Sequence, residues 1–460
     1  MEEFEVTKVG SKRDFLIFFV INVIDFLVLY YILQNITQAI ATTIFMATVI
    51  GTLMFWRFRL AIAFLGIALL LITRTLDLEH MIQFMSIDVI TFLISMMIVV
   101  RVAEEEGFFD WFLYKIMKYT GNDPRKVLIV IMSISTLMAA LVDEVTSILF
   151  ITAIIFRYTE KYKIPVVSFV IPAVLATNIG SSATLLGNPI GILIALRAGL
   201  TFEDFIFHAT PVALLALISI IPISLLWYRK DLKIPQEIVG SISNEEEHFN
   251  MNRVKRGGIL MISTILLIAL HYRIELLLGL EKNVFLIVAA MTGAFVALIW
   301  KRDHAREVVE KGVDWWTLTF FMFLFAKAGT LAYTGVTDKM AKAMATFSGN
   351  SLFVTVSIIL WVSGFGSSVL DNVVLVAAFI PVVKELEQYI GGSSLWWALL
   401  FGGTYGGNIT MVGSTANIVA LGLLEKKINY HMTFFKWFWI GLLGGIIPML
   451  VANAILFLYH

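Results

Sequence analysis

The sequence LVDEVT at residues 141–146 places two acidic residues, Asp143 and Glu144, inside an apolar stretch that runs from residue 127 to 156. A second apolar stretch, residues 351–386, carries Asp371 near its centre. A charge in the hydrocarbon interior of a membrane costs several kcal/mol. We therefore interpret each stretch as a re-entrant hairpin, in which two short helices meet at a polar tip.

The lengths of the two stretches support this interpretation. They hold 30 and 36 residues, whereas two full crossings of the hydrocarbon layer need roughly 40 helical residues. The alternative is one long tilted span for each stretch. It would leave Asp143 or Asp371 within a continuous apolar helix.

The rest of the chain is also apolar. It is 59% hydrophobic and 15% charged, against roughly 25% charged residues in an ordinary soluble domain, which excludes a water-soluble protein. Its apolar runs are continuous rather than alternating, which favours helices over an outer-membrane barrel. We predict an all-α integral membrane protein with about 11 transmembrane helices besides the two hairpins, at residues 15–35, 37–55, 60–76, 88–103, 165–196, 209–228, 258–271, 284–300, 313–334, 395–424 and 435–459.

The basic residues predict the orientation of the chain. With a cytoplasmic amino terminus and both hairpins re-entrant, 25 Lys and Arg residues fall on the cytoplasmic side. The opposite side holds Arg74, Arg197, Arg273, Lys282, Lys339, Lys342 and Lys384. This distribution is the positive-inside pattern. We therefore predict a multi-pass protein of the cell (plasma or inner) membrane, with its amino terminus in the cytoplasm and its carboxyl terminus outside.

The two halves of the chain repeat one design. At an offset of 226 to 228 residues, segments of the first half recur in order in the second, and each match contains a polar or glycine residue: 87–89 with 313–315, 101 with 327, 141–145 with 369–373, and 184–187 with 410–413. Because an odd number of crossings separates the starts of the two units, they face opposite ways. Inverted repeats with interrupted helices are typical of secondary transporters, whose binding site lies near the membrane midplane.

The repeat predicts how the chain is organised. The regions are amino-terminal scaffold helices (1–87), a first inverted repeat (88–228, with hairpin 127–156 and broken helix 165–196), a cytoplasmic linker (229–257), connecting helices (258–312), and a second inverted repeat (313–460, with hairpin 351–386 and broken helix 395–424).

Small and polar residues interrupt the span after each hairpin, at residues 177–189 and 406–417. Glycine and proline unwind a helix there, and backbone groups freed at that depth must line a cavity or bind a ligand. The alternative is that these residues only ease helix packing. Carbonyl, hydroxyl and amide oxygens suit a hard cation such as sodium, while helix amino termini suit an oxyanion. Both substrate classes stay open.

Carboxylates at the hairpin tips are natural proton carriers or cation ligands. Alternatively, a carboxylate caps the amino terminus of a hairpin helix, which could hold for Glu144 alone. We predict that substrate and coupling ion bind among the polar residues of the tips and the broken spans: Asp143, Glu144, Thr146, Asn178, Gly180, Ser181, Ser182, Thr184, Asn188, Ser368, Asp371, Asn372, Asn408, Thr410, Ser414, Thr415 and Asn417. A possible sodium site comprises Asp143, Asn178, Asp371 and Asn408.

Two basic residues share one position of the repeat, Arg101 and Lys327. Either could pair with the hairpin acids or with the acidic residue that begins its unit, Asp88 or Asp314. Arg101 could instead extend to an interface beside the acidic run 104–106.

Several other classes of function lack support. The chain has no cysteine, which excludes disulfides, thiolate metal sites and cysteine nucleophiles. It contains no His-Glu-x-x-His, Gly-x-Ser-x-Gly or P-loop motif, so we expect neither an enzyme nor direct ATP drive, and no cofactor. A formal net charge of zero gives no reason to expect a nucleic-acid partner.

Five segments give the chain a family resemblance: GFFD (107–110), LVDEVT (141–146), TNIGSSAT (177–184), LDNV (370–373) and GGNITMVGSTAN (406–417). The chain resembles the ion transporter superfamily, closest to the arsenite permease and melanosomal P-protein branch, near NhaD-type sodium/proton antiporters and more distantly the divalent anion:sodium symporters. The resemblance implies a scaffold domain, a mobile transport domain made of hairpins and broken helices, elevator-type movement and a homodimer.

The chain departs from that branch at three places. Asp143-Glu144 replaces the usual Asp-Asn pair, GNPIG at 187–191 replaces a Gly-Asp-Pro-Pro-Asn type sequence, and Lys327 lies where P-protein relatives are acidic. The Ser-Asn-Thr hairpin signature of the divalent anion symporters is absent, which disfavours a dicarboxylate substrate.

Together these observations predict a secondary active transporter that moves a small inorganic ion or oxyanion, coupled to H⁺ or Na⁺. It would act like an arsenite permease or P protein, or as a sodium/proton antiporter. The alternatives are a passive ion or anion channel and a sodium-coupled carboxylate symporter. The expected partners are the transported ion, the coupling ion, the lipid bilayer and a second copy of the chain.

Overall fold

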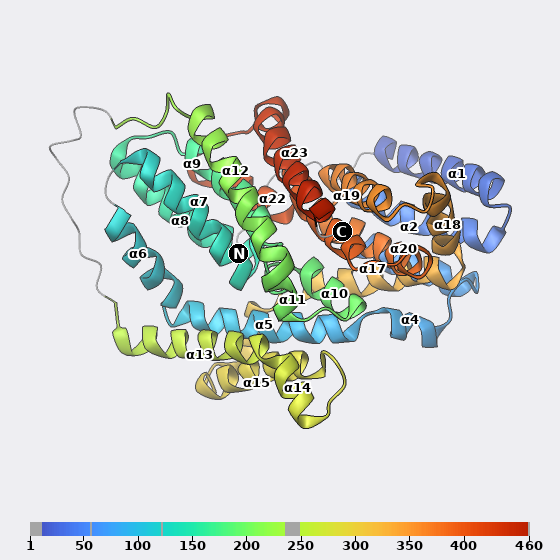
Figure 1. Cartoon of the computed structure of the whole chain (residues 1–460), viewed down its shortest axis with the longest axis horizontal. Coiled ribbons are helices and arrows are strands. Elements are labelled where there is room, and N and C mark those ends of the chain that lie inside the picture. The colour runs from blue at the N-terminus through green and yellow to red at the C-terminus, as the bar shows by residue number, and fades with distance from the viewer. Residues whose placement is uncertain (1–11, 56–57, 121–122, 235–248, 459–460) are drawn as a thin grey trace. The chain divides into compact units, whose positions relative to one another are not determined.

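The computed structural model describes residues 12–55, 58–120, 123–234 and 249–458 (Figure 1). Every regular element within these ranges is a helix, which confirms the all-α part of the prediction. The helices fall into two compact units, and the second repeat contributes to both of them.

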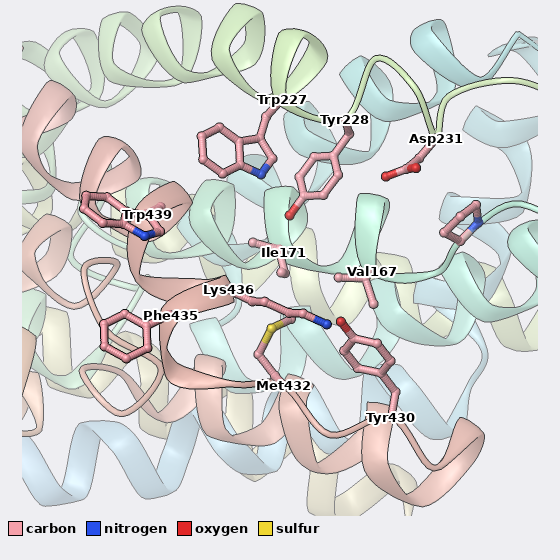
Figure 2. A pocket seen from close by; sticks show the side chains of 11 residues that line it. Val167, Ile171, Trp227, Tyr228, Asp231, Tyr430, Met432, Phe435, Lys436 and Trp439 are labelled. Carbon is pink, nitrogen blue, oxygen red and sulfur yellow. The ribbon is translucent and has the colours of Figure 1, made fainter.

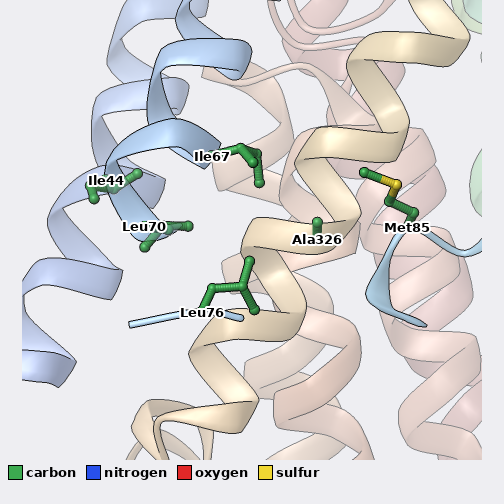
Figure 3. Packing of buried hydrophobic residues seen from close by; sticks show 6 residues of the cluster. All are labelled: Ile44, Ile67, Leu70, Leu76, Met85 and Ala326. Carbon is green, nitrogen blue, oxygen red and sulfur yellow. The ribbon is translucent and has the colours of Figure 1, made fainter. Parts of the chain in front are cut away.

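The first unit combines the amino-terminal helices with part of the second repeat. Its elements are α1 (Lys12–Leu33), α2 (Ile36–Met54), α3 (Arg59–Ile72), α4 (Leu78–Phe84), α17 (Trp315–Tyr333), α18 (Val336–Phe347) and most of α20 (Asn372–Ile390). Helix α17 packs against α2, α3 and α4. A cluster of six apolar side chains holds these helices together, as Figure 3 shows: Ile44, Ile67, Leu70, Leu76, Met85 and Ala326.

A lysine lies beside this apolar cluster. The Lys327 side chain is fully buried, and its Nζ atom donates a hydrogen bond to Thr48 Oγ1 at 2.6 Å. Gly66 gives the amine its space, because a Cβ there would come within 2.8 Å of Nζ. Lys327 forms no ion pair within the described ranges, whereas Asp314 accepts a hydrogen bond from the amide of Thr317 at the start of α17.

The second unit holds the first repeat, the connecting helices and the remainder of the second repeat. Its elements are α5 (Ile87–Glu105), α6 (Phe108–Thr120), α7 (Pro124–Leu141), α8 (Glu144–Tyr162), α9 (Val167–Gly180), α10 (Pro189–Ala198), α11 (Phe202–Asp204), the π-helix η2 (Phe205–Ala209), α12 (Thr210–Trp227), α13 (Met251–Ala269), α14 (His271–Leu278), α15 (Val284–Trp300), α16 (Ala305–Gly312), α19 (Leu352–Val369), α21 (Ser394–Gly406), α22 (Thr415–Ile428) and α23 (Phe434–Leu458).

Seven helices among the described residues are long and apolar enough to cross a membrane, or nine if two bent pairs each form one span. The bent pairs are α4 with α5, at 42°, and α13 with α14, at 58°. Four shorter apolar helices, α3, α9, α10 and α15, coincide with other predicted spans. The structure thus supports a multi-pass protein with several interrupted helices.

The two stretches predicted as hairpins break where the sequence indicates. Helix α7 ends at Leu141 and α8 starts at Glu144, while α19 ends at Val369 and α20 starts at Asn372. However, the helices extend beyond the apolar stretches, because Asp123 caps α7 at one end and α8 continues to Tyr162 at the other. Among the described residues, one helix of each pair, α7 or α19, is long and apolar enough to cross alone, whereas α8 and α20 are not among the candidate spans. The re-entrant hairpins therefore stay a prediction.

Two other boundaries differ from the sequence prediction. Helix α13 begins at Met251 because Asn250 caps it, accepting hydrogen bonds from the amides of residues 252 and 253, so the predicted linker 229–257 ends earlier. Nearly half of that linker, residues 235–248, lies outside the described ranges. The span predicted at 209–228 begins at Phe202, where Thr201 and Asp204 form a capping box.

Candidate transport site at the broken helices

The second unit contains both interrupted spans and both hairpin tips. Helix α9 ends at Gly180 and α10 begins at Pro189, while α21 ends at Gly406 and α22 begins at Thr415. Asn188 caps α10 by accepting a hydrogen bond from the Gly191 amide at 2.8 Å. Ser414, its counterpart in the repeat, caps α22. The predicted interruptions are therefore confirmed, and each ends at a polar cap that directs the next helix.

Glycines bring each broken span against the preceding helix. A Cβ atom on Gly180 would overlap the backbone of Thr136 in α7, and a Cβ atom on Gly406 would overlap the backbone of Gly364 in α19. These two contacts occupy equivalent positions of the repeat. The structure gives Gly180 a packing contact, and its predicted role in ligand binding stays a prediction.

The same hydrogen bond fastens both broken spans to the helices before them. The Thr184 hydroxyl donates to the Ala140 carbonyl, and the Thr410 hydroxyl donates to the Ser368 carbonyl. In both spans the threonine oxygen also accepts a hydrogen bond from the amide two residues later. The distance is 3.1 Å for the Leu186 amide in the first span and 3.4 Å for the corresponding amide in the second. We call these two sets of bonds the threonine clasps. They occur at equivalent positions of the two predicted repeat units.

The three acids at the hairpin tips differ in their surroundings. Asp143 accepts hydrogen bonds from the amides of Val145 and Thr146, both at 2.8 Å, and so caps α8. Asp371 accepts from the Val373 amide at 3.0 Å and from the Thr415 hydroxyl at 3.3 Å. The expectation that the capping role could hold for Glu144 alone was wrong, because Asp143 occupies the cap position.

Glu144 is the tip acid that is available for other chemistry. Its side chain is 4% exposed, and its Oε1 atom lies 3.5 Å from the Ser414 hydroxyl. Oε2 is buried without a hydrogen-bond partner in the described structure, as are Ser147 Oγ and Asn372 Oδ1. Asp143 directly precedes Glu144, and Asp371 contacts Thr415, the residue after Ser414, so the three acids gather around one end of α22. No ion pair to any of these three acids occurs within the described ranges.

Three asparagines connect the two broken spans. The Asn178 amide nitrogen donates to Asn408 Oδ1 at 2.7 Å and to Asn417 Oδ1 at 2.9 Å. Its Oδ1 atom accepts from the Ser414 hydroxyl at 2.9 Å. We call Asn178, Asn408, Asn417 and Ser414 the amide cluster. All four residues are fully or almost fully buried.

Backbone carbonyls complete the hydrogen bonding of the amide cluster. Asn408 donates to the Leu175 and Gly444 carbonyls at 3.3 and 2.9 Å, and Asn417 donates to the Gly407 and Thr410 carbonyls at 2.8 and 2.9 Å. In the second broken span, the Asn417 side chain thus pairs two carbonyls of the backbone that the sequence predicted to unwind. The oxygens of Asn178 and Asn408 are likewise already paired.

The remaining predicted residues surround the cluster. Asn188 donates to the Ser181 hydroxyl at 2.9 Å, and Ser181 donates to the Asn178 carbonyl at 3.0 Å. Ser182 bonds to the Tyr405 hydroxyl at 3.0 Å, a residue that the sequence analysis missed. Of the four predicted sodium ligands, the structure brings Asn178 and Asn408 into contact, while the two aspartates lie at separate helix starts. The described residues hold no group of three or more acidic or histidine side chains arranged around a metal.

Arg101 does not take part in this site. It pairs with Glu104 and Glu105 of its own helix, at 3.2 and 3.1 Å, beside the acidic run as the interface alternative expected.

This fold and this site define a multi-pass membrane transporter: interrupted helices from two repeats meet at a buried polar cluster, and acids without counter-ions adjoin it. The chain belongs to the citrate transporter family, whose model matches residues 49–402.

Relatives support this assignment. An uncharacterized transporter of Mycobacterium tuberculosis is 33% identical over 349 residues, covering 74% of this chain and 78% of the relative. The human P protein is 26% identical over 454 residues, covering 82% of this chain and 53% of the relative. The resemblance to the P-protein branch of the ion transporter superfamily is thereby confirmed.

A solved structure shares the fold. The YdaH transporter of Alcanivorax borkumensis, whose crystal structure has an unusual topology, superposes with a TM-score of 0.54 at 14% identity. The superposition covers 80% of this chain and 84% of that one.

Proposed function

We propose that this protein is a secondary active transporter that moves a small inorganic ion or oxyanion, with H⁺ or Na⁺ as the coupling ion and Glu144 as the carboxylate that binds it. The observation that carries the proposal is the buried Glu144 side chain, which has one oxygen near Ser414 and the other without a partner. A buried carboxylate with no counter-ion favours uptake of a proton or a cation.

The position of Glu144 supports coupling to the substrate site. Ser414 lies between Glu144 and Asn178, at 3.5 Å from the first and 2.9 Å from the second. A serine hydroxyl has one proton to donate, so it can serve only one of these acceptors at a time. Binding of the coupling ion to Glu144 therefore changes the acceptor to which Ser414 donates its proton. The hydrogen bonding of the amide cluster changes with it.

The arrangement of the chain in the membrane is part of the proposal. We propose that the two repeats are inverted, that the tips of 127–156 and 351–386 re-enter the bilayer, and that the amino terminus is cytoplasmic. Whether each stretch re-enters or crosses twice, the number of crossings changes by an even number, so the positive-inside distribution is preserved. Elevator-type movement and a homodimer follow from the resemblance to the ion transporter superfamily.

Carboxylate symport is the second candidate, favoured by the name of the family. Asp143, Glu144 and Asp371 adjoin the site through the contacts described above, and none of them forms an ion pair among the described residues. Their charge would repel a tricarboxylate such as citrate. Transport of citrate here requires protons or cations bound with it, which the same acids would supply. Arsenite and other small oxyanions that are neutral or weakly charged do not face this repulsion.

The test is flux into proteoliposomes that hold the purified protein and a pH-sensitive dye. We expect a sodium, arsenite or citrate gradient to move protons, and expect Glu144→Gln to reduce that movement to the level of protein-free liposomes. Gln keeps the length of the side chain and can still accept from Ser414, so folding is preserved. Glu160→Gln, an exposed acid on the same helix, is the matched control.

Asp143→Asn and Asp371→Asn remove the negative charge of each aspartate but keep its helix cap, because Asn caps a helix about as well as Asp. They therefore test the effect of the charge on flux separately from the effect of the cap. Full activity of Glu144→Gln would overturn its assignment as the coupling carboxylate. If radiolabelled solute equilibrates across the membrane but never accumulates against its gradient, the protein is a passive channel instead.

A further inference from the structure

A pocket of about 530 Å³ lies in the second unit, away from the amide cluster. The start of α9, the end of α12 and the segment that leads into α23 form its walls. Figure 2 shows aromatic rings on several sides, from Trp227, Tyr228, Tyr430, Phe435 and Trp439, with the Lys436 side chain extending between them. The volume is typical of a small-molecule site.

One cation faces these aromatic walls. In Figure 2 the Lys436 amine points toward Tyr430, and Nζ lies 5.8 Å from the centre of that ring. Lys436 forms no ion pair in the part of the chain that the structure describes. The pocket also contains one acid, Asp231, which lies on the opposite side from Trp439 in Figure 2.

The segments that form the pocket are strongly basic, although the whole chain has a formal net charge of zero. Residues 160–167, 227–233 and 425–439 contain three acids, Glu160, Asp231 and Glu425. They contain eight basic residues: Lys161, Lys163, Arg229, Lys230, Lys233, Lys426, Lys427 and Lys436. The positive-inside pattern assigns the basic residues of these segments before residue 435 to the cytoplasm. Lys436 lies at the start of the span predicted at 435–459.

The pocket also opens toward the surroundings of the protein. Trp227, Phe435 and Trp439 are 46%, 70% and 56% exposed. Tryptophan and tyrosine gather where a membrane protein meets the lipid headgroups. Exposed aromatic residues next to basic segments are the combination expected where membrane helices end at the lipid headgroups.

We propose that this pocket binds an anionic phospholipid of the surrounding bilayer. The phosphate would pair with Lys436 and accept hydrogen bonds from the tyrosine hydroxyls. The first part of the acyl chains would lie against Trp439 and Phe435, and headgroup hydroxyls would donate to Asp231. Basic pockets at the cytoplasmic ends of membrane helices bind anionic headgroups in this way.

Occupancy would connect elements of the transport site. The pocket contacts α9 at its amino-terminal end, and the carboxyl-terminal end of that helix carries Asn178. Helix α12 packs against both α9 and α23. A bound lipid would therefore tie α9 to α12 and α23 from the cytoplasmic side.

Native mass spectrometry of the detergent-solubilised protein tests the proposal independently of transport. Phosphatidylglycerol is titrated and compared with phosphatidylcholine of the same acyl chains. We expect preferential retention of phosphatidylglycerol, and about fivefold weaker binding in Lys436→Gln, since one basic residue near an anionic lipid contributes about that factor. Lys436→Arg should restore binding.

Lys115→Gln is the matched control, because Lys115 also lies over an aromatic ring, at 5.4 Å from the centre of Trp111, but outside the pocket. Equal retention of the two lipids, or unchanged binding in Lys436→Gln, would overturn the proposal. Glycerol phosphate that competes as tightly as the phospholipid would also overturn it and assign the pocket to a soluble anion.

Discussion

The two adjacent acids at the first hairpin tip have different roles because they occupy different positions at the start of α8. Asp143 precedes the first turn of α8, so its carboxylate accepts from two free amides. Glu144 is the first residue of the helix, has no such donors, and faces Ser414. The sequence predicts that acids occupy the tip. It does not show which of them caps the helix, since that depends on one residue of register.

The amide cluster shows what else sequence could and could not predict. Polar residues at matched positions of two apolar spans indicated Asn178, Asn408 and Asn417, which lie together as expected. Tyr405 was missed because a tyrosine in an apolar helix does not by itself indicate a binding site. Only the fold shows that its hydroxyl meets Ser182. Its place directly before the Gly406-Gly407 break was the available signal.

A prediction at the residue scale concerns Lys327, a buried cation whose described partner is a single hydroxyl. Replacing a buried charge with an apolar side chain of similar volume often stabilises a protein by about 1 kcal/mol or more. We therefore expect Lys327→Met to raise the midpoint of thermal unfolding in detergent. Lys384→Met, at an exposed position, should leave it unchanged. A clear fall in the midpoint would show that the amine stabilises the first unit.

At the scale of elements, the threonine clasps and the glycine contacts together fix how each broken span meets the helix before it. Both sets recur at equivalent positions. The repeat was visible in the sequence because these residues, unlike lipid-facing Leu or Ile, cannot be exchanged freely. Helix ends were less predictable: α7 and α8 extend into polar sequence through Asp123 and Tyr162, where capping and packing outweigh hydropathy.

The glycine contacts yield a prediction about pairs of helices. In Gly180→Ala and Gly406→Ala the new methyl group would meet the backbone of Thr136 or Gly364, and backbone cannot rotate away. We expect each variant to lose about 1–3 kcal/mol of stability, measured as a lower unfolding midpoint, and to lose flux as the clasps open.

Gly258→Ala is the comparison for these variants, because the nearest atoms there belong to the Phe108 side chain, at 3.0 Å. A side chain can shift, so we expect a smaller loss. Equal losses at all three glycines would show that helix propensity, rather than backbone contact, decides the effect.

At the scale of the whole molecule, composition and the repeat predicted the helical membrane fold, and the family model and relatives agree with it. The amide cluster arises only when spans separated by more than 200 residues meet, as in the hydrogen bond between Asn178 and Asn408. Sequence spacing predicts each span, but not which atoms pair between spans. That is why the candidate residues were predicted better than their roles.

The orientation can be tested in this chain without removing native thiols, because it has no cysteine. We expect Lys282→Cys to react with an impermeant maleimide added to intact cells. Lys163→Cys and Lys427→Cys should react only after permeabilisation, since the positive-inside pattern places them in the cytoplasm. All three positions are exposed. The reverse labelling pattern would mean that the chain is inserted with its amino terminus outside.

The hydrogen bonding of Asn178 has a consequence for how strongly the protein can hold its cargo. Each polar atom of that side chain already has a partner. An incoming solute therefore replaces existing hydrogen bonds with new ones and does not pair free donors or acceptors. The net gain from such an exchange is small. A weakly held cargo leaves quickly on the far side, and for a carrier rapid release serves turnover better than tight capture.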